Sequence, residues 1–364
     1  QAGGPGAVFW MWLTALLGIA TKFFTCTLAV MYRGRDDQGQ LQGGPMYVVR
    51  EGLGPRWRPL AVFFCVTAAV GTLPVFQSNQ LTQIVRDVIF VPQGWVDARN
   101  HFTFDLLFGT LLATGVGTVI FGGIQRIGAV AGRLVPLMVL IYLAATLIVM
   151  ARHAAELPSL FALIVTDAFR GEAVAGGAVG SVILTGVRRG AFSNEAGVGT
   201  APMAHGAART HEPVREGLVA MLGPVVDTLV VCSCTAFAIL ATGVWRDSES
   251  DGVTLSAQAL EAGLPGVGAL LLVGLVVMLS VSTMFTFWYY GAKCLGFLLG
   301  SRRGLAYRWL YVALIVGGSV GSLDAVIALI DSMYALMAIP TITSAVLLSP
   351  RVLEASRDYF RRHG

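Results

Sequence analysis

The chain has 364 residues, of which 55% are hydrophobic and only 13% are charged, and its mean hydropathy is +0.72. A soluble protein carries roughly a quarter charged residues, so this composition indicates an integral membrane protein. The net charge is only +4, and no basic cluster with interleaved aromatic residues is present, which argues against nucleic-acid binding.

Nine segments of the chain are predicted to span a membrane, a task that needs about 20 mostly apolar residues each. The fifth and eighth are short, and a short span beside a glycine-rich break is typical of a discontinuous helix. We see no separate soluble domain and expect residues 1–364 to form a single transmembrane domain. The predicted spans are Ala7–Tyr32, Leu60–Val91, Phe104–Gly122, Ala129–Ala151, Ala173–Val187, Leu218–Val244, Val267–Leu299, Tyr307–Val320 and Leu323–Leu348.

Arginine residues are concentrated in every second connection between these spans. The first, third, fifth and seventh connections and the C-terminal tail are basic, whereas the connections between them are poor in bases and the sixth is acidic. By the positive-inside rule, the C-terminus of this multi-pass protein of the cell (inner or plasma) membrane is expected in the cytoplasm. Gln1 then falls outside, which predicts a further helix before it.

Polar residues interrupt the first two spans, and an ionisable residue within a span is a functional candidate by default. Lys22 lies in the first span, where snorkelling toward the membrane surface is an equal alternative. In the second span, Pro74 opens the helix just before Gln77 and Asn79. Freed carbonyls and these two amides could bind the charged ends of an amino acid, although such side chains also form hydrogen bonds between membrane helices.

The stretch Arg189–Pro202 reads RGAFSNEAGVGTAP and directly follows the fifth apolar run. Its glycines and small polar residues predict unwound backbone, which within a membrane must be lined by protein or water because lipid cannot satisfy it. Transporters build sites for small solutes in this way, with helix ends and freed carbonyls directed at the solute. Glu195 in this stretch either caps the neighbouring half-helix or neutralises Arg188 or Arg189.

Three more ionisable residues lie within the later spans. Asp227 is predicted to pair with Lys22 or to cap a helix, in preference to coupling an ion. Lys293 lies near the cytoplasmic end of its span and is expected to snorkel. Asp331 either bonds the backbone that Pro340 frees or takes part in a solute pathway.

The seventh span carries a run of hydroxyl side chains that includes Ser282 and Thr283. Hydroxyl oxygens and helix carbonyls suit a hard monovalent cation such as Na⁺. The alternative is that each hydroxyl bonds back to its own helix turn.

The sequence offers no catalytic constellation. All five histidines lie in connections or near a chain end, and all five cysteines lie in apolar runs. Cys232 and Cys234 are close together, but neither a histidine nor a second pair accompanies them, so apolar packing is the expected role. We therefore do not expect an enzyme.

Two stretches of the chain resemble the sodium:alanine symporter family (alanine or glycine:cation symporters). One is Gly3–Gly18, which reads GGPGAVFWMWLTALLG, and the other is Phe192–Gly197 with the following Thr200–Pro202. A contiguous match that contains FWMW is far more specific than a lone glycine motif. Shorter matches follow the family order through the chain at Gly43–Tyr47, Gly122–Ile127, Val226–Thr228, Tyr289–Gly291 and Leu336–Pro340.

The resemblance implies an all-α integral membrane protein with the inverted five-plus-five helix repeat of the leucine-transporter fold. It also implies alternating-access symport of Na⁺, as coupling ion, with a small neutral amino acid of the alanine or glycine class into the cell. The family's first unwound helix, which precedes the GGPG motif, is missing from this chain. The expected contacts with the amino acid are Gln77, Asn79, Phe192, Ser193, Asn194, Gly197, Thr200, Thr283, Phe287 and Trp288, and those with Na⁺ are Ser282 and Thr283.

Departures from the family pattern fall at positions along the expected pathway. Pro74 follows Leu73 where relatives often have Gly-Asn, and Phe287 aligns with a usual pocket tryptophan. Thr25 replaces a glutamate after Lys22, and Tyr334 replaces an asparagine. These changes preserve the expected fold and leave the exact amino acid open.

Other functions remain open on the sequence alone. One is a transport-inactive or sensor homologue of the same fold, another is an H⁺-coupled carrier of a different small amino acid, and a third is a channel with uncoupled flux. The expected partners are a small neutral amino acid and membrane lipid, and a monomer is sufficient for symport.

Overall fold

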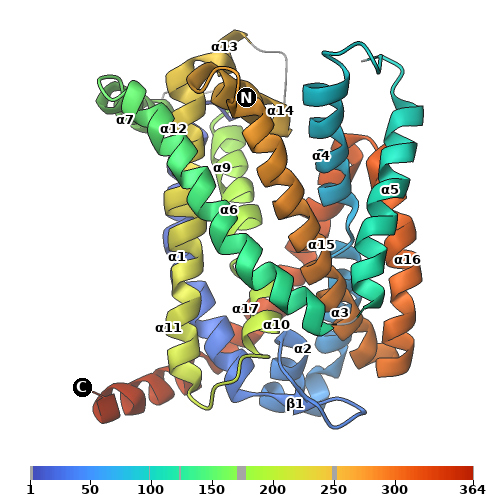
Figure 1. Ribbon diagram of the computed structural model, residues 1–364. Helices are drawn as coiled ribbons and strands as arrows, with labels where there is room; N and C mark the ends of the chain where they lie inside the picture. Colours follow the sequence, from blue (N-terminus) through green and yellow to red (C-terminus); the bar gives the residue numbers. More distant parts are fainter. Residues whose placement is uncertain (1–2, 98, 123, 170–177, 248–251, 364) are drawn as a thin grey trace.

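The computed structural model describes residues 3–97, 99–122, 124–169, 178–247 and 252–363. These residues are helical apart from their connections and one short hairpin (Figure 1), which confirms the predicted all-helical membrane class. The inverted repeat stays a prediction. The helices are α1 (Gly6–Met31), α2 (Pro45–Tyr47), η1 (Val48–Leu53), η2 (Pro55–Trp57), α3 (Arg58–Gly71), α4 (Val75–Val85), η3 (Arg86–Phe90), α5 (Phe102–Phe121), α6 (Ile124–Arg152), α7 (Leu157–Ala168), α9 (Ala178–Asn194), α10 (Thr200–His205), α11 (Pro213–Pro224), η4 (Val225–Cys232), α12 (Ser233–Thr242), α13 (Val244–Asp247), α14 (Gly252–Gly263), α15 (Gly268–Leu299), α16 (Ser301–Val320) and α17 (Leu323–His363), and the strands are β1 (Gly34–Arg35) and β2 (Leu41–Gln42).

Seven helical stretches in the described residues are long and apolar enough to cross a membrane. They correspond to the first, second, third, fourth, sixth, seventh and ninth predicted spans. The fifth predicted span, Ala173–Val187, begins among residues 170–177, which lie outside the described residues. The eighth corresponds to α16, which is not among the seven. The seven stretches are Gly6–Met31, Pro55–Phe90, Phe102–Phe121, Val135–Arg152, Pro213–Thr242, Gly268–Leu299 and Leu323–His363.

Two of the longer helices among the described residues lie in connections where the sequence predicted none. The apolar helix α7 occupies the fourth connection, and α14 occupies the acidic sixth connection. In α14, Leu255 and Leu260 are buried against the bundle, so this connection is part of the packed structure. Each of the two helices has 12 residues, which is too short to register as a membrane span.

The second span is interrupted where the sequence predicted, at Pro74. Helix α3 ends at Gly71, the Thr72 hydroxyl donates to the Ala68 carbonyl at 2.7 Å, and α4 begins at Val75. Proline has no N–H and crowds the preceding turn, which favours a break here. Pro136 and Pro340 lie inside the continuous helices α6 and α17, so the Thr72 side-chain bond and the local packing also contribute to the break.

Close helix packing depends on glycines that face other helices. In α9, Gly186 and Gly190 lie one turn apart and contact α1. A Cβ atom at Gly186 would lie 2.5 Å from the Ala7 carbonyl oxygen, and one at Gly190 would lie 2.9 Å from Thr14 Cβ. Small residues at this spacing let membrane helices approach closely.

The basic first and seventh connections and the basic C-terminal tail gather at one end of the bundle, whereas Arg188 and Arg189 lie within α9. Figure 1 shows the hairpin, the C-terminal part of α17 and the turn between α15 and α16 at this end, and the start of α1 with α13 and α14 at the other. We call these the basic end and the opposite end. Helices α1, α11 and α12 lie on one side of the bundle and α4, α5 and α16 on the other, with α9 and α10 between them (Figure 1).

Candidate solute site at the broken helix

The predicted break in the fifth span is present. Helix α9 ends at Asn194 and α10 begins at Thr200. Between them, Glu195, Gly197 and Gly199 have φ angles of 52°, 83° and 109°, which belong to the left-handed region. A non-glycine residue rarely adopts this conformation, so Glu195 marks a backbone that its surroundings hold in place.

Side chains from the break and from α17 fix its shape. Asn194 Oδ1 accepts the Ala196 N–H at 2.9 Å, and the Thr200 hydroxyl donates to the Glu195 carboxylate. Thr341 of α17 donates its hydroxyl to the Val198 carbonyl at 3.2 Å. The bonds to the Ala196 N–H and the Val198 carbonyl satisfy part of the unwound backbone without lipid or water. The Glu195 carboxylate binds only the Thr200 hydroxyl, and α10 has no side-chain cap within the described residues, so the predicted capping by Glu195 is not present.

A polar cluster lies beside the end of α9. The Ser193 hydroxyl donates to the Asp227 carboxylate, which also accepts the Thr228 hydroxyl at 3.1 Å. The predicted pairing of Lys22 with Asp227 is wrong as a direct contact, because these two described residues form no ion pair and the ammonium lies beside Gly223. Asp227 itself lies in the π-helical stretch η4, a local geometry frequent at functional sites.

Two layers of side chains close the break toward the opposite end. Arg189 Nη2 and Asp331 Oδ2 form an ion pair at 2.7 Å between α9 and α17. Three residues further along each helix, Phe192 stacks on Tyr334 with ring centroids 5.7 Å apart. Phe76 of α4 packs edge-on against Phe192 at 5.1 Å. Two of the predicted alternatives are therefore not seen in the described residues. Asp331 binds Arg189 and not the backbone near Pro340, and Arg189 does not neutralise Glu195.

Within the described residues, Gln77 and Asn194 are two of the predicted substrate-binding residues that have a buried polar atom without a hydrogen-bond partner. These atoms are the amide oxygen Oε1 of Gln77 and the amide nitrogen Nδ2 of Asn194, and the two residues are 8% and 2% exposed. The Asn194 amide faces α1, where a Cβ atom at Gly18 would lie 3.4 Å from it. Unsatisfied buried groups are rare, and here one is an acceptor and the other a donor.

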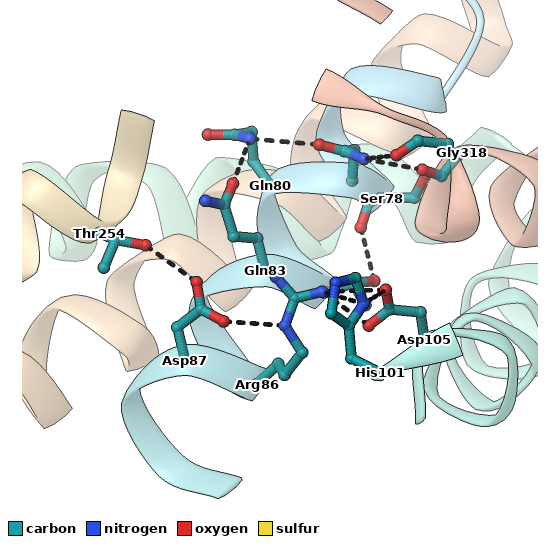
Figure 2. Close-up of polar contacts among 12 residues, drawn as sticks. Ser78, Gln80, Gln83, Arg86, Asp87, His101, Asp105, Thr254 and Gly318 are labelled. Carbon is teal, nitrogen blue, oxygen red and sulfur yellow. Dashed lines mark hydrogen bonds and ion pairs between the residues drawn. The ribbon is translucent and has the colours of Figure 1, made fainter. Parts of the chain in front are cut away.

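Asn79, unlike Gln77 and Asn194, has hydrogen-bond partners for both ends of its amide. Figure 2 shows its neighbourhood, in which Asn79 Nδ2 donates to the Gly318 and Gly321 carbonyls at 3.1 and 2.7 Å. Gln80 Nε2 donates to Asn79 Oδ1 at 3.3 Å. The Asn79 amide nitrogen thus caps the C-terminal end of α16, while its oxygen binds Gln80; the expected contact of Asn79 with the amino acid stays a prediction.

Near Asn79, an ionic network joins η3 to α5. The sequence analysis did not predict this network. Arg86 Nη1 lies 2.9 Å from Asp105 Oδ2, and His101 Nδ1 lies 2.6 Å from the same oxygen (Figure 2). The spacing of four residues between His101 and Asp105 at a helix start was the one available signal.

The predicted Na⁺ ligands lie on α15 and differ in how their hydroxyls are used. Ser282 donates to the Leu279 carbonyl at 2.9 Å, as the local alternative predicted, and keeps its lone pairs. Thr283 is half-buried, and its hydroxyl forms no hydrogen bond within the described residues. Phe287 is buried at 4% exposure, with its ring 6.3 Å from that of Tyr290. Trp288, one residue further on, lines a separate cavity at the basic end.

Two cationic side chains close the break toward the basic end. Lys293 Nζ donates to the Met203 carbonyl in α10 at 3.0 Å and lies 3.4 Å from the Gly43 carbonyl oxygen. The expectation that Lys293 snorkels is therefore wrong, because its ammonium binds backbone inside the protein. Arg33 donates to the carbonyls of Gly206, Ala208 and Thr210 at 2.6–2.8 Å, which ties the first connection to the end of α10.

The chain is similar over its whole length to known transporters of one family. The model of the sodium:alanine symporter family matches residues 1–364. An uncharacterized transporter of Haemophilus influenzae is 37% identical over 371 residues, covering 100% of this chain and 78% of the relative. The sodium/alanine symporter AgcS of Methanococcus maripaludis is 36% identical, covering 98% of this chain and 78% of the relative. The probable sodium/glutamine symporter GlnT of Bacillus subtilis is 36% identical, covering 99% and 73%. The chain belongs to the sodium:alanine symporter family.

Proposed function

We propose that the protein is a secondary transporter that carries a small neutral amino acid into the cell together with Na⁺. The observation that carries this proposal is the broken helix between α9 and α10, which is closed by a different set of contacts on each side. Membership of the family supports it, as do relatives whose names give sodium with alanine or with glutamine. The name of another relative gives sodium or proton dependence, so H⁺ is the alternative coupling ion.

The two unpartnered amide atoms suit the two ends of an amino acid. Asn194 Nδ2 would donate to the carboxylate, and Gln77 Oε1 would accept the ammonium. Phe192 and Phe287 would form the walls, and backbone groups from Ser193 to Thr200 would complete the contacts. The bulky Tyr334 against Phe192 favours a small side chain on the substrate.

For Na⁺, the proposed ligands are the hydroxyls of Ser282 and Thr283. A hydroxyl that donates its hydrogen to a helix carbonyl still has lone pairs for a cation, so the Ser282 bond does not exclude this role. The half-buried Thr283 hydroxyl has both its hydrogen and its lone pairs available within the described residues.

In this proposal, the contacts on the two sides of the break are the gates of an alternating-access cycle. Opening toward the opposite end requires Arg189 to leave Asp331 and Phe192 to leave Tyr334. Opening toward the basic end requires Lys293 to release the Met203 and Gly43 carbonyls. In this proposal the basic end, including the C-terminus, faces the cytoplasm, since basic connections stay on that side.

The proposal is tested by uptake of labelled alanine, glycine and glutamine into proteoliposomes, with and without an inward Na⁺ gradient. A parallel arm replaces the Na⁺ gradient with an inward H⁺ gradient. We expect accumulation of at least one of the three that requires Na⁺. Accumulation driven by H⁺ alone would show that H⁺, and not Na⁺, is the coupling ion. No accumulation under either gradient would contradict the transporter function.

A further inference from the structure

The last part of α17 extends beyond the membrane-spanning part of the bundle. The helix has 41 residues, and at a rise of about 1.5 Å per residue it is about twice as long as the hydrocarbon core of a bilayer is thick. Its apolar part ends near Leu348, and residues 350–363 follow, which we call the tail segment. Figure 1 shows the tail segment at the basic end, where it projects sideways from the bundle across the direction of α11.

One face of the tail segment is apolar and uncovered. Leu353 and Phe360 are 47% and 54% exposed, and they lie about two turns apart on the same side of the helix. Val346 lies two turns before Leu353, within the membrane-spanning part, and it belongs to the same stripe with 64% exposure. A different side of the helix carries Leu348 and Val352, which are buried against residues of α1 and η1. The outward apolar face of the span therefore continues into the tail segment.

Arginines lie along this apolar stripe. Arg357 lies one turn from both Leu353 and Phe360, is exposed and forms no ion pair within the described residues. Arg361 Nη1 lies 3.8 Å from Asp358 Oδ1, but the two side chains are 80% and 61% exposed, so solvent screens this pair. In the tail segment, four arginines and two acidic residues leave a net charge of +2. A helix face that combines exposed apolar side chains with arginines is typical of a segment at the surface of a membrane.

Both ends of the tail segment are held near the bundle. Arg362 Nη1 lies 3.1 Å from Glu212 Oε1, which ties the end of the segment to the connection between α10 and α11. The membrane-spanning part of α17 anchors the other end. A segment that is tethered at a surface has a high effective concentration there, so a short apolar stripe and a few charges are sufficient for binding.

From these observations we propose that the tail segment is an interfacial helix that binds anionic phospholipids of the leaflet at the basic end. Leu353 and Phe360 insert at the boundary between headgroups and acyl chains, and Arg357 and Arg361 bind the phosphate groups. Each arginine near an anionic surface adds to the binding, so the binding depends on the charge of the lipid. The proposal goes beyond the transport function and does not depend on which solute the protein carries.

Amide hydrogen exchange of residues 350–363 tests the proposal in the complete chain. The protein is placed in nanodiscs that hold one copy each, which excludes a second copy as the cover of the apolar stripe. The discs are made of phosphatidylcholine alone or of an equimolar mixture of phosphatidylcholine and phosphatidylglycerol. Wild type and variants are compared in the same discs, so that the effect of an anionic surface on the local pH cancels.

The decisive variant is the double change Arg357→Gln with Arg361→Gln, since glutamine has a helix propensity close to that of arginine. In the anionic discs we expect its tail segment to exchange about tenfold faster than that of the wild type, because two contacts with headgroups are lost. In discs of phosphatidylcholine alone, the two proteins should exchange at similar rates. Salt at about 1 M should remove most of the difference in the anionic discs, because the Debye length falls to about 3 Å.

The matched control is the double change Arg302→Gln with Arg303→Gln, which removes two exposed charges at the start of α16, on the other side of the bundle. Its tail segment should exchange as in the wild type in both kinds of disc. Phe360→Gln removes an apolar contact and should accelerate exchange in both kinds of disc.

Equal exchange of the wild type and the Arg357/Arg361 variant in the anionic discs would overturn the proposal. An equal difference in the two kinds of disc would also overturn it, because the arginines would then act on the protein and not on the lipid. The same holds if the Arg302/Arg303 control changes exchange as much as the tail variant does. The measurement involves no transport, so its outcome is separate from that of the uptake test.

Discussion

At the residue scale, the ion pair between Arg189 and Asp331 has the most direct consequence for transport. Its side chains are 39% and 23% exposed, so solvent screens the pair and limits its contribution to stability. The pair matters because of where it lies. It joins the broken helix to α17 on the side of the break away from the basic end. A pair of this strength can separate and re-form during a transport cycle.

Reversing one charge of this pair should impair uptake, and reversing both should restore it. Arg189→Asp or Asp331→Arg alone places like charges across the α9–α17 contact, which holds the gate apart. The double variant re-creates an attractive pair and should recover most of the Na⁺-driven uptake. Uptake by the double variant no better than by the singles would show that the pair does not act as a gate.

Thr283 and Thr286 provide a matched test of the ion site one turn apart on α15. Thr283→Val removes a hydroxyl that has no hydrogen bond within the described residues, so the expected effect is the loss of a Na⁺ ligand. The Na⁺ concentration for half-maximal uptake should rise by about tenfold, the equivalent of roughly 1.4 kcal/mol. Thr286→Val removes a hydroxyl that donates to the Ser282 carbonyl at 3.1 Å and should leave this concentration unchanged. An unchanged Na⁺ dependence in Thr283→Val would remove Thr283 from the ion site.

At the scale of elements, the break between α9 and α10 depends on glycine for two reasons. Gly199 has a φ of 109°, and a Cβ atom there would lie 2.5 Å from Phe64 Cε2 and 2.7 Å from Thr341 Oγ1. Gly243 also has a positive φ, of 71°, but a Cβ atom there would meet nothing within 4 Å. A comparison of Gly199 with Gly243 therefore separates the cost of the left-handed backbone from the cost of a steric conflict.

Gly199→Ala should destabilise the protein more than Gly243→Ala does. Each change costs about 1–2 kcal/mol for the left-handed conformation, and the conflict with Phe64 adds about 1–3 kcal/mol at Gly199 alone. The free energies of unfolding in detergent, measured by denaturant titration, provide the comparison. Equal losses for the two variants would contradict the tight contact between the break and α3.

The hairpin at the basic end is attached to α16 through one carboxylate. Asp37 accepts the Ser301 N–H at 3.0 Å and the Ser301 hydroxyl, and these bonds hold the pKa of Asp37 below its ordinary value of 3.8. A lowered pKa means that the attachment is fully present above the ordinary value and is lost as the pH falls through the lowered value.

Asp37→Ala should therefore loosen the hairpin at neutral pH. Amide hydrogen exchange of residues 34–42 is expected to accelerate, and wild-type exchange, corrected for the intrinsic pH effect, should approach that of the variant under acid conditions. Asp97→Ala at the opposite end serves as a control, because Asp97 bonds only within its own connection. Unchanged exchange in Asp37→Ala would show that other contacts hold the hairpin.

At the scale of the whole molecule, hydropathy and glycine content predicted where the long helices and the break lie. They did not predict which side chains contact one another. The seven long spans and the break follow from local composition, which a sequence displays directly. The partner of Asp331 lies 142 residues away, and that of Lys293 lies 90 residues away, so only the packed bundle reveals them. The contact of Asn79 with α16 was missed for the same reason, since its amide nitrogen binds a carbonyl 239 residues further along the chain.

The central claim is that an amino acid rests at the broken helix, and binding of labelled alanine, glycine and glutamine to the purified protein tests it most directly. Asn194→Asp keeps the oxygen that accepts the Ala196 N–H and replaces the unpartnered amide donor with a second oxygen. Asn79→Asp makes the same change at a residue that caps α16. We predict Na⁺-dependent binding of at least one amino acid by the wild type, a loss of affinity of about tenfold or more in Asn194→Asp, and lower stability with unchanged affinity in Asn79→Asp. Unchanged affinity in Asn194→Asp would contradict the account.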